Sequence, residues 1–364
     1  MSDTPYPFLR NCWYTAGWDY EVIDGKKLAR TFLEKPVVIF RGESGQYVAL
    51  DDRCCHRGAP LSLGRIEGDC LRCMYHGMKY DAAGICIEIP GQDMISAQHR
   101  VHSYPIEERG HLLWIWMGDP ELADPGLIHD FSYLSDPEWA GLTQQAYLHY
   151  DANWLLIVDN LADFSHLAFV HTDTLGGSED YAFSTEQEVE RLEDGFQFVR
   201  WDKGSPPPPY HVRACPDAPD KVDRRNEVKM LVPGIFFMET SFAPVGWDPD
   251  SGDLEGVRQY KNCQYMTPET RRTTHFFWEY LRNYKQDDPN VSLSLRDGMM
   301  AGFMEDKILI EEQQKYLELD EPFQPRGLVA DKALSHFRKV WNKKVAEENE
   351  KYPREQVEIR NPIL

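Results

Sequence analysis

Two short runs of cysteine and histidine near the start of the chain have the residue types and the spacing of a metal site. Cys54 and His56 lie in Cys-Cys-His-Arg-Gly, and Cys73 and His76 lie in Cys-Met-Tyr-His-Gly. Together they supply two thiolates and two imidazoles from two loops. This set suits a [2Fe–2S] cluster with both cysteines on one iron and both histidines on the other. Such a cluster transfers single electrons, so the rest of the chain must supply their acceptor.

A structural zinc site is the alternative, because Cys70 and Cys73 form the C-x-x-C pair that zinc sites often use. The two His–Gly elements, one in each loop, favour a cluster exposed between two loop tips, which is the Rieske arrangement. Neutral imidazole in place of charged thiolate raises the reduction potential to about −150 to +300 mV, above that of an all-cysteine ferredoxin.

A second set of candidate ligands lies between residues 159 and 171. Asn160, Asp163 and His166 are each three residues apart, a spacing that predicts one shared helix face. His171 follows His166 by five residues, which is about 140° around an ideal helix. The helix must therefore end or distort if both imidazoles bind one metal. Two histidines and one carboxylate form a facial triad that suits non-haem Fe(II) and leaves positions open for O2.

The carboxylate of this triad is predicted to be Asp306. It falls on one helical stripe with Met299, Phe303 and Ile310, where an acid is costly to bury unless a cation accompanies it. Glu305 is the alternative, although it points away from that stripe. Asp163 and Asn160 are the candidate catalytic residues rather than ligands. We expect Asp163 to support the metal indirectly, by accepting the outer N–H of His166. A solvated helix acid is the alternative for Asp163.

The elements that must position these residues divide the chain into two parts, predicted as residues 1–125 and 126–364. The first part is predicted to be a β domain with the cluster loops at its tip. Strands are predicted over 36–40 and 47–50, which read as a hairpin, on either side of a turn at 81–84, and over 111–117. The proline-rich segment 120–125 is the predicted linker.

The second part mixes helices with an antiparallel sheet, so the fold class is α+β. Helices are predicted over 153–170, 293–318 and 331–350, and strands over 228–232, 234–240 and 273–281. The run from Ser205 to Tyr210 contains four consecutive prolines and predicts a loop or polyproline stretch. The last helix carries an apolar stripe that we interpret as packing, formed by Leu334, Phe337, Trp341 and Val345.

Composition and charge exclude several classes of partner. The chain has 364 residues and a net charge of −21, which disfavours nucleic acids and anionic membranes. No apolar run approaches the roughly 20 residues that cross a bilayer. Eight cysteines show no paired framework and the chain starts without a signal peptide, so a cytoplasmic protein is expected.

Taken together, these motifs resemble the α subunit of Rieske non-haem iron oxygenases. The resemblance runs from Cys-x-His-Arg-Gly through Leu-Trp-Ile-Trp-x-Gly-Asp to Phe-x-Glu-Asp-Lys-x-Ile, and the chain is most similar to the branch of vanillate and dicamba O-demethylases. It implies a catalytic domain of the helix-grip (START-like) kind and a homotrimer. In that trimer Asp163 would link His166 to His76 of the partner subunit and pass the electron. It also implies an NAD(P)H-dependent reductase with a flavin and a ferredoxin-type centre.

The predicted function is therefore that of a terminal oxygenase in the breakdown of aromatic compounds. The predicted reaction is O-demethylation of a methoxylated, vanillate-like aromatic acid. Ring hydroxylation or cis-dihydroxylation of a phthalate- or phenoxybenzoate-like acid is the alternative, and an electron carrier without catalysis is a remote one. The sequence says little about substrate contacts. The candidates are His275, Arg200 and His211, with Arg213, Arg258 and Arg282 in the same region, and the apolar strand around His275 makes it the strongest of them.

Overall fold

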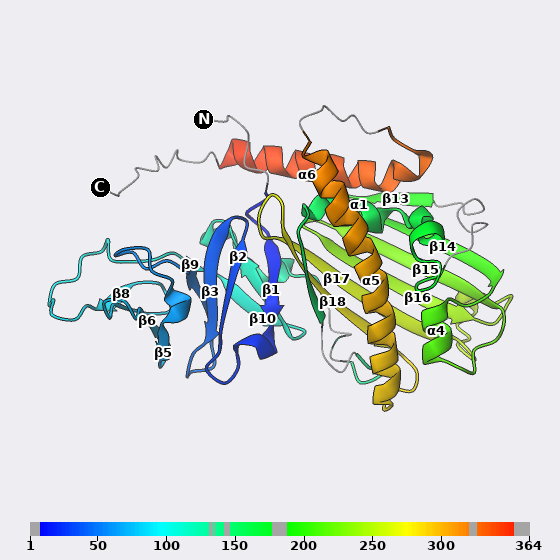
Figure 1. Cartoon of the computed structure of the whole chain (residues 1–364), viewed down its shortest axis with the longest axis horizontal. Helices are drawn as coiled ribbons and strands as arrows, with labels where there is room; N and C mark the ends of the chain where they lie inside the picture. Colours follow the sequence, from blue (N-terminus) through cyan, green and yellow to red (C-terminus); the bar gives the residue numbers. More distant parts are fainter. Residues whose placement is uncertain are drawn as a thin grey trace.

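The computed structural model of the chain describes residues 8–130, 134, 136–141, 146–176, 188–319 and 326–352. These residues form an N-terminal part made of small sheets and a C-terminal part built on one large sheet that helices cover (Figure 1). The short 3-10 helices η3 (Pro120–Leu122) and η4 (Pro125–Leu127) lie at the predicted boundary after residue 125, which stays a prediction.

Three antiparallel sheets make up the N-terminal part. The predicted hairpin over residues 36–50 is confirmed, with Phe40 paired to Val48. The sheets are β1 (Trp13–Trp18), β11 (Leu112–Trp116) and β10 (Ile106–Arg109); β2 (Lys27–Phe32), β3 (Lys35–Arg41), β4 (Tyr47–Asp51) and β9 (Ser103–Tyr104); and β5 (Arg65–Glu67), β6 (Cys70–Arg72), β7 (Lys79–Tyr80) and β8 (Cys86–Glu88).

A seven-stranded antiparallel sheet forms the base of the C-terminal part. Because side chains alternate between the two faces of a strand, each strand presents one set of residues to the helices and the other set to the opposite side. In spatial order the strands are β12 (Ala146–Tyr150), β18 (Thr274–Arg282), β17 (Arg258–Pro268), β16 (Ile235–Ala243), β15 (Val222–Leu231), β14 (Gly195–Ser205) and β13 (Glu188–Leu192).

Helices cover one face of this sheet, and in Figure 1 the long orange helix α5 crosses over its strands. The predicted helix over 293–318 is α5 (Pro289–Leu317), which starts with Asp288 as its N-cap and proline at the first helical position. The other helices are α1 (Trp154–Ala162), η6 (Phe164–His166), α2 (Leu167–Val170), α4 (Pro209–Ala214) and α6 (Lys332–Lys351). The predicted proline-rich loop thus ends earlier than expected, because Pro209 and Tyr210 open α4.

Two apolar clusters hold these layers together. Phe337 and Trp341 of α6 are buried against the helix-covered face, with ring centroids 6.2 and 4.5 Å from that of Trp154, so the predicted packing stripe is confirmed. A second cluster joins the two parts of the chain, where Trp18 packs edge-on against Phe277.

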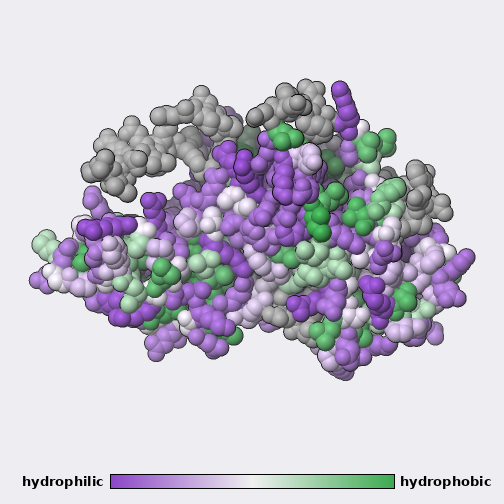
Figure 2. Space-filling view, viewed as in Figure 1, coloured by the Kyte–Doolittle hydropathy of each residue, from purple (hydrophilic) through white to green (hydrophobic). Residues whose placement is uncertain are grey.

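The surface seen in Figure 2 is mainly hydrophilic, with scattered hydrophobic side chains. Within the described ranges, no helix is both long and apolar enough to cross a membrane.

Candidate metal centres and the adjoining cavity

The two cysteine–histidine motifs form two loops of the same shape at the tip of the N-terminal part. The Gly58 amide donates to the Cys54 carbonyl and the Gly77 amide to the Cys73 carbonyl, at 2.9 and 3.0 Å. Both glycines have positive φ, near 70° and 80°, which other residues rarely adopt. A Cβ at Gly77 would also come within 2.7 Å of Pro90. The glycine at the end of each loop is therefore needed to close it.

These loops bring the four predicted cluster ligands together. The Cys54 and Cys73 side chains are buried, and burial together with the neighbouring Cys54 thiol raises the pKa of Cys73. The His56 and His76 rings lie at the exposed end of the loops, with centroids 4.5 Å apart. The two thiols are therefore buried beside each other and the two imidazoles are exposed beside each other, which fits a [2Fe–2S] cluster with an exposed, histidine-bound iron.

The cysteines outside the predicted set do not complete a zinc site. Cys70 lies on strand β6, paired in register with Glu67, rather than in the loop tip. Cys55 is exposed, and its sulfur is 3.2 Å from the Tyr80 hydroxyl, which also lies 3.1 Å from the sulfur of Cys54. The Tyr80 hydroxyl thus reaches one ligand sulfur, and hydrogen bonds to ligand sulfurs help set the potential of such clusters.

The helix that carries the second motif breaks at Asp163. Helix α1 ends at Ala162, and Asp163 has an extended backbone with φ −131° and ψ 107°. Its carboxylate accepts hydrogen bonds from the amide and the hydroxyl of Ser165, both at 2.8 Å, and so caps η6. The expectation that Asn160, Asp163 and His166 share one helix face is therefore wrong, because a local cap competes with the helix. The predicted end of the helix between His166 and His171 is confirmed, because α2 ends at Val170 and His171 leaves the helical conformation.

Because of this break, His166 and His171 converge on Asp306 of α5. Their ring nitrogens and the Asp306 carboxylate lie within 4.8 Å of one another. The Asp306 Oδ1 atom is 3.1 Å from Nε2 of His171 and 3.6 Å from Nε2 of His166. Nε2 of His171 is buried and has no well-formed hydrogen bond. A buried nitrogen of this kind beside a buried carboxylate fits a cation between them, and two histidines with one carboxylate suit Fe(II).

The outer nitrogens of both histidines are held by acceptors, which turns Nε2 of each ring toward the centre. His171 Nδ1 lies 2.7 Å from Glu305 Oε2. His166 Nδ1 donates to the backbone carbonyl of Asp163, so the predicted bond to the Asp163 carboxylate is wrong for this chain. Glu305, the alternative ligand, contacts the far side of His171 instead. Such outer acceptors orient metal-binding histidines and increase their basicity.

The pKa values of the two histidines shift in opposite directions. Burial lowers the pKa of His166. Burial also disfavours the charged form of His171, but Asp306 and Glu305 together raise the pKa of that ring. Asn160, a candidate catalytic residue, donates from Nδ2 to Asp306 Oδ1 at 2.9 Å and so fixes the orientation of the carboxylate. A catalytic role for Asn160 stays a prediction.

A narrow cavity adjoins the three candidate ligands. Its free space is about 540 Å³ including the part open to solvent, but the centre of a water molecule can occupy only about 50 Å³ of it. The side of the cavity formed by the sheet, here called its floor, contributes three polar residues that our sequence reasoning missed: Arg224, Asn262 and Gln264. Alternation along β15 could have revealed Arg224, since it shares a face with Val222 and Val228. The apolar lining includes Leu161, Phe164, Leu167, Phe236, Met299 and Phe303.

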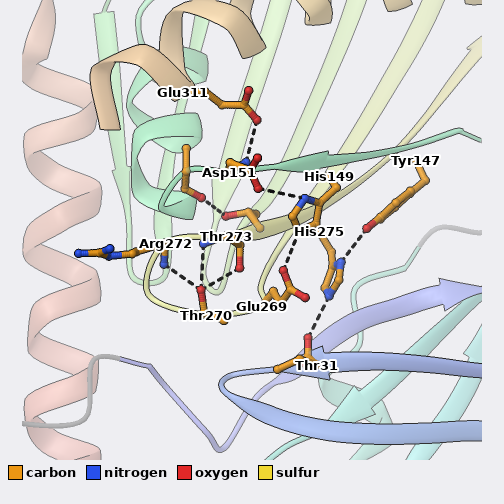
Figure 3. Close-up of polar contacts among 12 residues, drawn as sticks. Thr31, Tyr147, His149, Asp151, Glu269, Thr270, Arg272, Thr273, His275 and Glu311 are labelled. Carbon is orange, nitrogen blue, oxygen red and sulfur yellow. Dashed lines mark hydrogen bonds and ion pairs between the residues drawn. The ribbon is translucent and has the colours of Figure 1, made fainter. Parts of the chain in front are cut away.

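The prediction that His275 contacts the substrate is wrong. On β18 the helix-covered face carries Phe276 and Trp278, so His275 points to the opposite face, toward the N-terminal part. There it lies 2.9 Å from both the Tyr147 hydroxyl and the Thr31 carbonyl (Figure 3). His275 is buried because it lies in the contact between the two parts of the chain.

The other two substrate candidates lie on the correct side of the sheet but outside the cavity lining. Arg200 is a buried residue of β14, and His211 stacks on Phe242 with ring centroids 4.0 Å apart. His211 Nδ1 also lies 2.5 Å from the Tyr260 hydroxyl. The residue that does line the cavity beside His211 is Tyr210. Arg200 and His211 therefore stay unassigned as substrate contacts.

The fold and the two sites together define the oxygenase subunit of a Rieske non-haem iron oxygenase: a cluster-binding β domain joined to a helix-covered sheet with a two-histidine, one-carboxylate site. Residues 12–105 match the Rieske [2Fe–2S] domain, and residues 150–347 match the vanillate O-demethylase oxygenase C-terminal domain. The chain belongs to this vanillate O-demethylase oxygenase family. An electron carrier without catalysis is thereby excluded, because the family is one of oxygenase subunits and the matched C-terminal domain holds the second ligand set.

Similar proteins cover nearly the whole chain. The toluene-4-sulfonate monooxygenase iron-sulfur subunit TsaM1 of Comamonas testosteroni is 39% identical over 348 residues, 94% of this chain and 98% of that protein. The dicamba O-demethylase oxygenase component of Stenotrophomonas maltophilia is 34% identical over 332 residues, covering 90% and 94%. A crystal structure of dicamba monooxygenase with non-haem iron and dicamba has a TM-score of 0.81 at 31% identity, covering 95% and 99%. A Rieske cluster and a mononuclear iron are the cofactors of this class.

Proposed function

We propose that this oxygenase subunit oxidises the methyl group of a methoxylated aromatic acid and so removes it. One observation carries the proposal: the candidate metal ligands form one wall of a narrow cavity whose lining is mainly apolar and aromatic. A cavity of this shape suits a single flat ring, and its few polar groups can fix the orientation of that ring.

The residues of the chain account for most of what the reaction requires. Bound Fe(II) would supply O2 activation, with electrons from the cluster. His166, His171 and Asp306 would hold the metal, while Phe164 and Phe303 exclude water and orient the substrate ring. The overall reaction converts an aryl methyl ether, O2, two electrons and two protons into a phenol, formaldehyde and water. The hydroxylated methyl ether is a hemiacetal, which breaks down to the phenol and formaldehyde.

Sequence identity to relatives favours a second candidate reaction, which is hydroxylation of the ring methyl group of an arylsulfonate. The toluene-4-sulfonate monooxygenase subunit is more similar to this chain, at 39%, than the dicamba O-demethylase component, at 34%. The chemistry is the same oxidation of a methyl group, and the product would be a benzylic alcohol. Ring hydroxylation and cis-dihydroxylation stay alternatives, with phthalate and phenoxybenzoate as their test substrates.

A product assay with the loaded enzyme, NADH and a surrogate reductase tests the proposal. The substrates are 4-methoxybenzoate, 4-toluenesulfonate, phthalate and 3-phenoxybenzoate. We expect 4-methoxybenzoate to yield one formaldehyde and one phenol per O2 consumed, and 4-toluenesulfonate to yield its benzylic alcohol. Diols from phthalate, with no formaldehyde from 4-methoxybenzoate, would contradict the proposal.

The assembly we propose is a homotrimer in which the cluster of one subunit serves the iron of the next. In Figure 1 the cluster loops near β5, β6 and β8 lie at one end of the molecule, far from α1 and α5. The cluster site and the iron site of the same subunit are therefore far apart. Exposed apolar side chains flank both sites: Met74 and Tyr75 beside the cluster, and Phe169 and Ile308 beside the iron ligands. Exposed apolar groups of this kind are typical of docking surfaces.

Asp163 has a proposed role in this assembly. Its backbone carbonyl already holds His166, and its carboxylate lies beside Ser165, half-buried at the edge of the site. We propose that this carboxylate meets His76 of the partner subunit and that the electron passes there. An oxygenase component also needs a reductase, and we propose the flavin and ferredoxin-type NAD(P)H enzyme.

A further inference from the structure

The cavity has a roof and a floor of different character. The roof is helical and supplies His166, His171 and Asp306. The floor is the sheet, and it contributes three polar side chains that are all buried. Arg224 of β15 is 6% exposed, and Asn262 and Gln264 of β17 are 4% and 1% exposed. An aromatic substrate held between roof and floor would have its reacting group toward the metal ligands and another substituent toward the three polar side chains of the floor.

The two floor amides have hydrogen-bonding capacity that the protein does not use. Asn262 Oδ1 and Gln264 Oε1 are buried and lack a hydrogen-bond partner among the described residues. An unpartnered buried polar atom costs about 1–3 kcal/mol, so native proteins rarely keep one without a function. Because the two ends of an amide can exchange by rotation, each side chain can present either an acceptor or an N–H₂ donor to a ligand.

The floor of the cavity includes one cationic side chain. Among the described residues that line the cavity, Arg224 alone has a permanently charged cationic side chain. Its guanidinium also lies over the Phe242 ring, 5.6 Å from the centroid. Nearby, burial together with Arg258 and Arg224 lowers the pKa of His211 to about 3, so that ring stays neutral despite Asp217. Asp202 stands opposite Arg224 in the β14–β15 register.

We propose that Arg224 is the specificity residue that binds the anionic group of the aromatic substrate, with Asn262 and Gln264 as further hydrogen-bonding partners. The inference rests on the proposed oxidation of an aromatic acid and deepens it. A guanidinium presents two parallel N–H groups that match a carboxylate or a sulfonate. Binding of the anion at the floor holds the methyl group of the same ring near Asp306 and the two histidines.

The test compares anionic substrates with neutral ones of similar shape in Arg224→Met. The pairs are 4-methoxybenzoate with 4-methoxybenzamide, and 4-toluenesulfonate with 4-toluenesulfonamide. We expect kcat/KM of the variant to fall about 30- to 100-fold for the anions, and less than about threefold for the amides, since only the anions lose an ion pair with two parallel charge-assisted hydrogen bonds. Comparison of the two anions shows whether carboxylate or sulfonate is preferred.

A matched control lies one residue away. Arg225 is on the opposite face of β15, where it forms an ion pair with Glu227 and lies over the Trp201 ring. Arg225→Met should leave both substrate classes unaffected. Arg224→Lys, which keeps the charge but loses the paired N–H groups, should show an intermediate loss and provides the test if Arg224→Met does not fold.

A binding measurement separates this inference from the proposed function. Benzoate and benzenesulfonate are titrated into the loaded enzyme by calorimetry, without reductase. If wild type and Arg225→Met bind them and Arg224→Met binds at least tenfold more weakly, Arg224 is the anion site even when none of the aromatic ethers is oxidised. Equal binding by all three proteins, or equal loss of activity for anions and amides in Arg224→Met, would overturn the assignment and indicate a structural partnership with Asp202.

Discussion

Two neighbouring acids on α5 have different relations to the same histidine. Asp306 faces Nε2 of His171 from inside the site, and Glu305 holds Nδ1 of the same ring from outside, while also accepting from the Thr174 hydroxyl at 2.6 Å. Residues one apart on a helix point about 100° away from each other, which allows one helix to contact both sides of the ring. The tautomer of His171 that can bind a metal therefore depends on Glu305.

We predict that Glu305→Ala weakens iron binding. Loss of the acceptor frees the His171 ring and lowers its basicity, and such changes typically reduce metal affinity about 10- to 100-fold. The measurement is Fe(II) retention against a competing chelator, with the cluster signal in EPR as an internal reference. Glu312→Ala, on the exposed side of α5 in an ion pair with Lys315, is the control. Retention equal to wild type in Glu305→Ala would show that Glu305 does not support the metal.

At the level of the secondary-structure elements, strands of the two parts of the chain meet at His275. Its Nε2 donates to the Thr31 carbonyl of β2, and its Nδ1 accepts from the Tyr147 hydroxyl of β12 (Figure 3). This pattern requires a neutral ring. Burial, with Arg30 and His149 nearby and Glu269 opposing them, lowers the pKa of His275 to about 4.

The contact between the two parts of the chain should therefore weaken in acid. The unfolded chain binds a proton at His275 below about pH 6.5, whereas the folded protein does so only near pH 4, so the free energy of unfolding falls as the pH drops through this window. Lowering the pH from 7.5 to 5.0 should reduce the free energy of unfolding by about 2 kcal/mol through this single group.

The matched variant for this prediction is His275→Gln, whose amide can keep both hydrogen bonds but cannot titrate. Urea unfolding at pH 7.5 and 5.0 should show a smaller loss of stability in the variant than in wild type, by about 2 kcal/mol. The same pH dependence in both proteins would mean that His275 is not the group responsible.

The proposed homotrimer would account for the exposed apolar side chains that flank both metal sites. In such a ring, head-to-tail contacts would place the cluster loops of each subunit against the iron site of the next. We predict that two inactive variants complement each other when they assemble together. His76→Ala removes a cluster ligand, and Asp306→Ala removes an iron ligand.

Co-expressed with different affinity tags and purified as mixed trimers, the two variants should regain up to about a third of wild-type activity, because in every mixed ring one of the three head-to-tail contacts joins an intact cluster to an intact iron site. Each variant alone should be inactive. Mixed trimers with no activity, or a chain that is monomeric and active, would contradict electron transfer between subunits.

Much of this protein was predictable because its chemistry depends on local spacing. The cluster ligands from Cys54 to His76 lie within a short segment. A glycine closes each of the two loops, and the β5–β6 hairpin connects one loop to the other. The strands on either side of residues 41–46 and the helices over 289–317 and 332–351 follow from local periodicity and capping, which neighbouring residues determine.

Long-range packing decided the remaining features. His275 and Arg224 are both polar residues in apolar strands, but only the layers around the sheet decide which strand face is covered by helices and which meets the N-terminal part. The break at Asp163 has a local cause instead, because its carboxylate caps η6 through Ser165, and a helical spacing pattern does not reveal such a cap. Neighbours in sequence limit what a side chain can do, whereas neighbours in space, brought there by burial of apolar surface, determine which of those possibilities it takes.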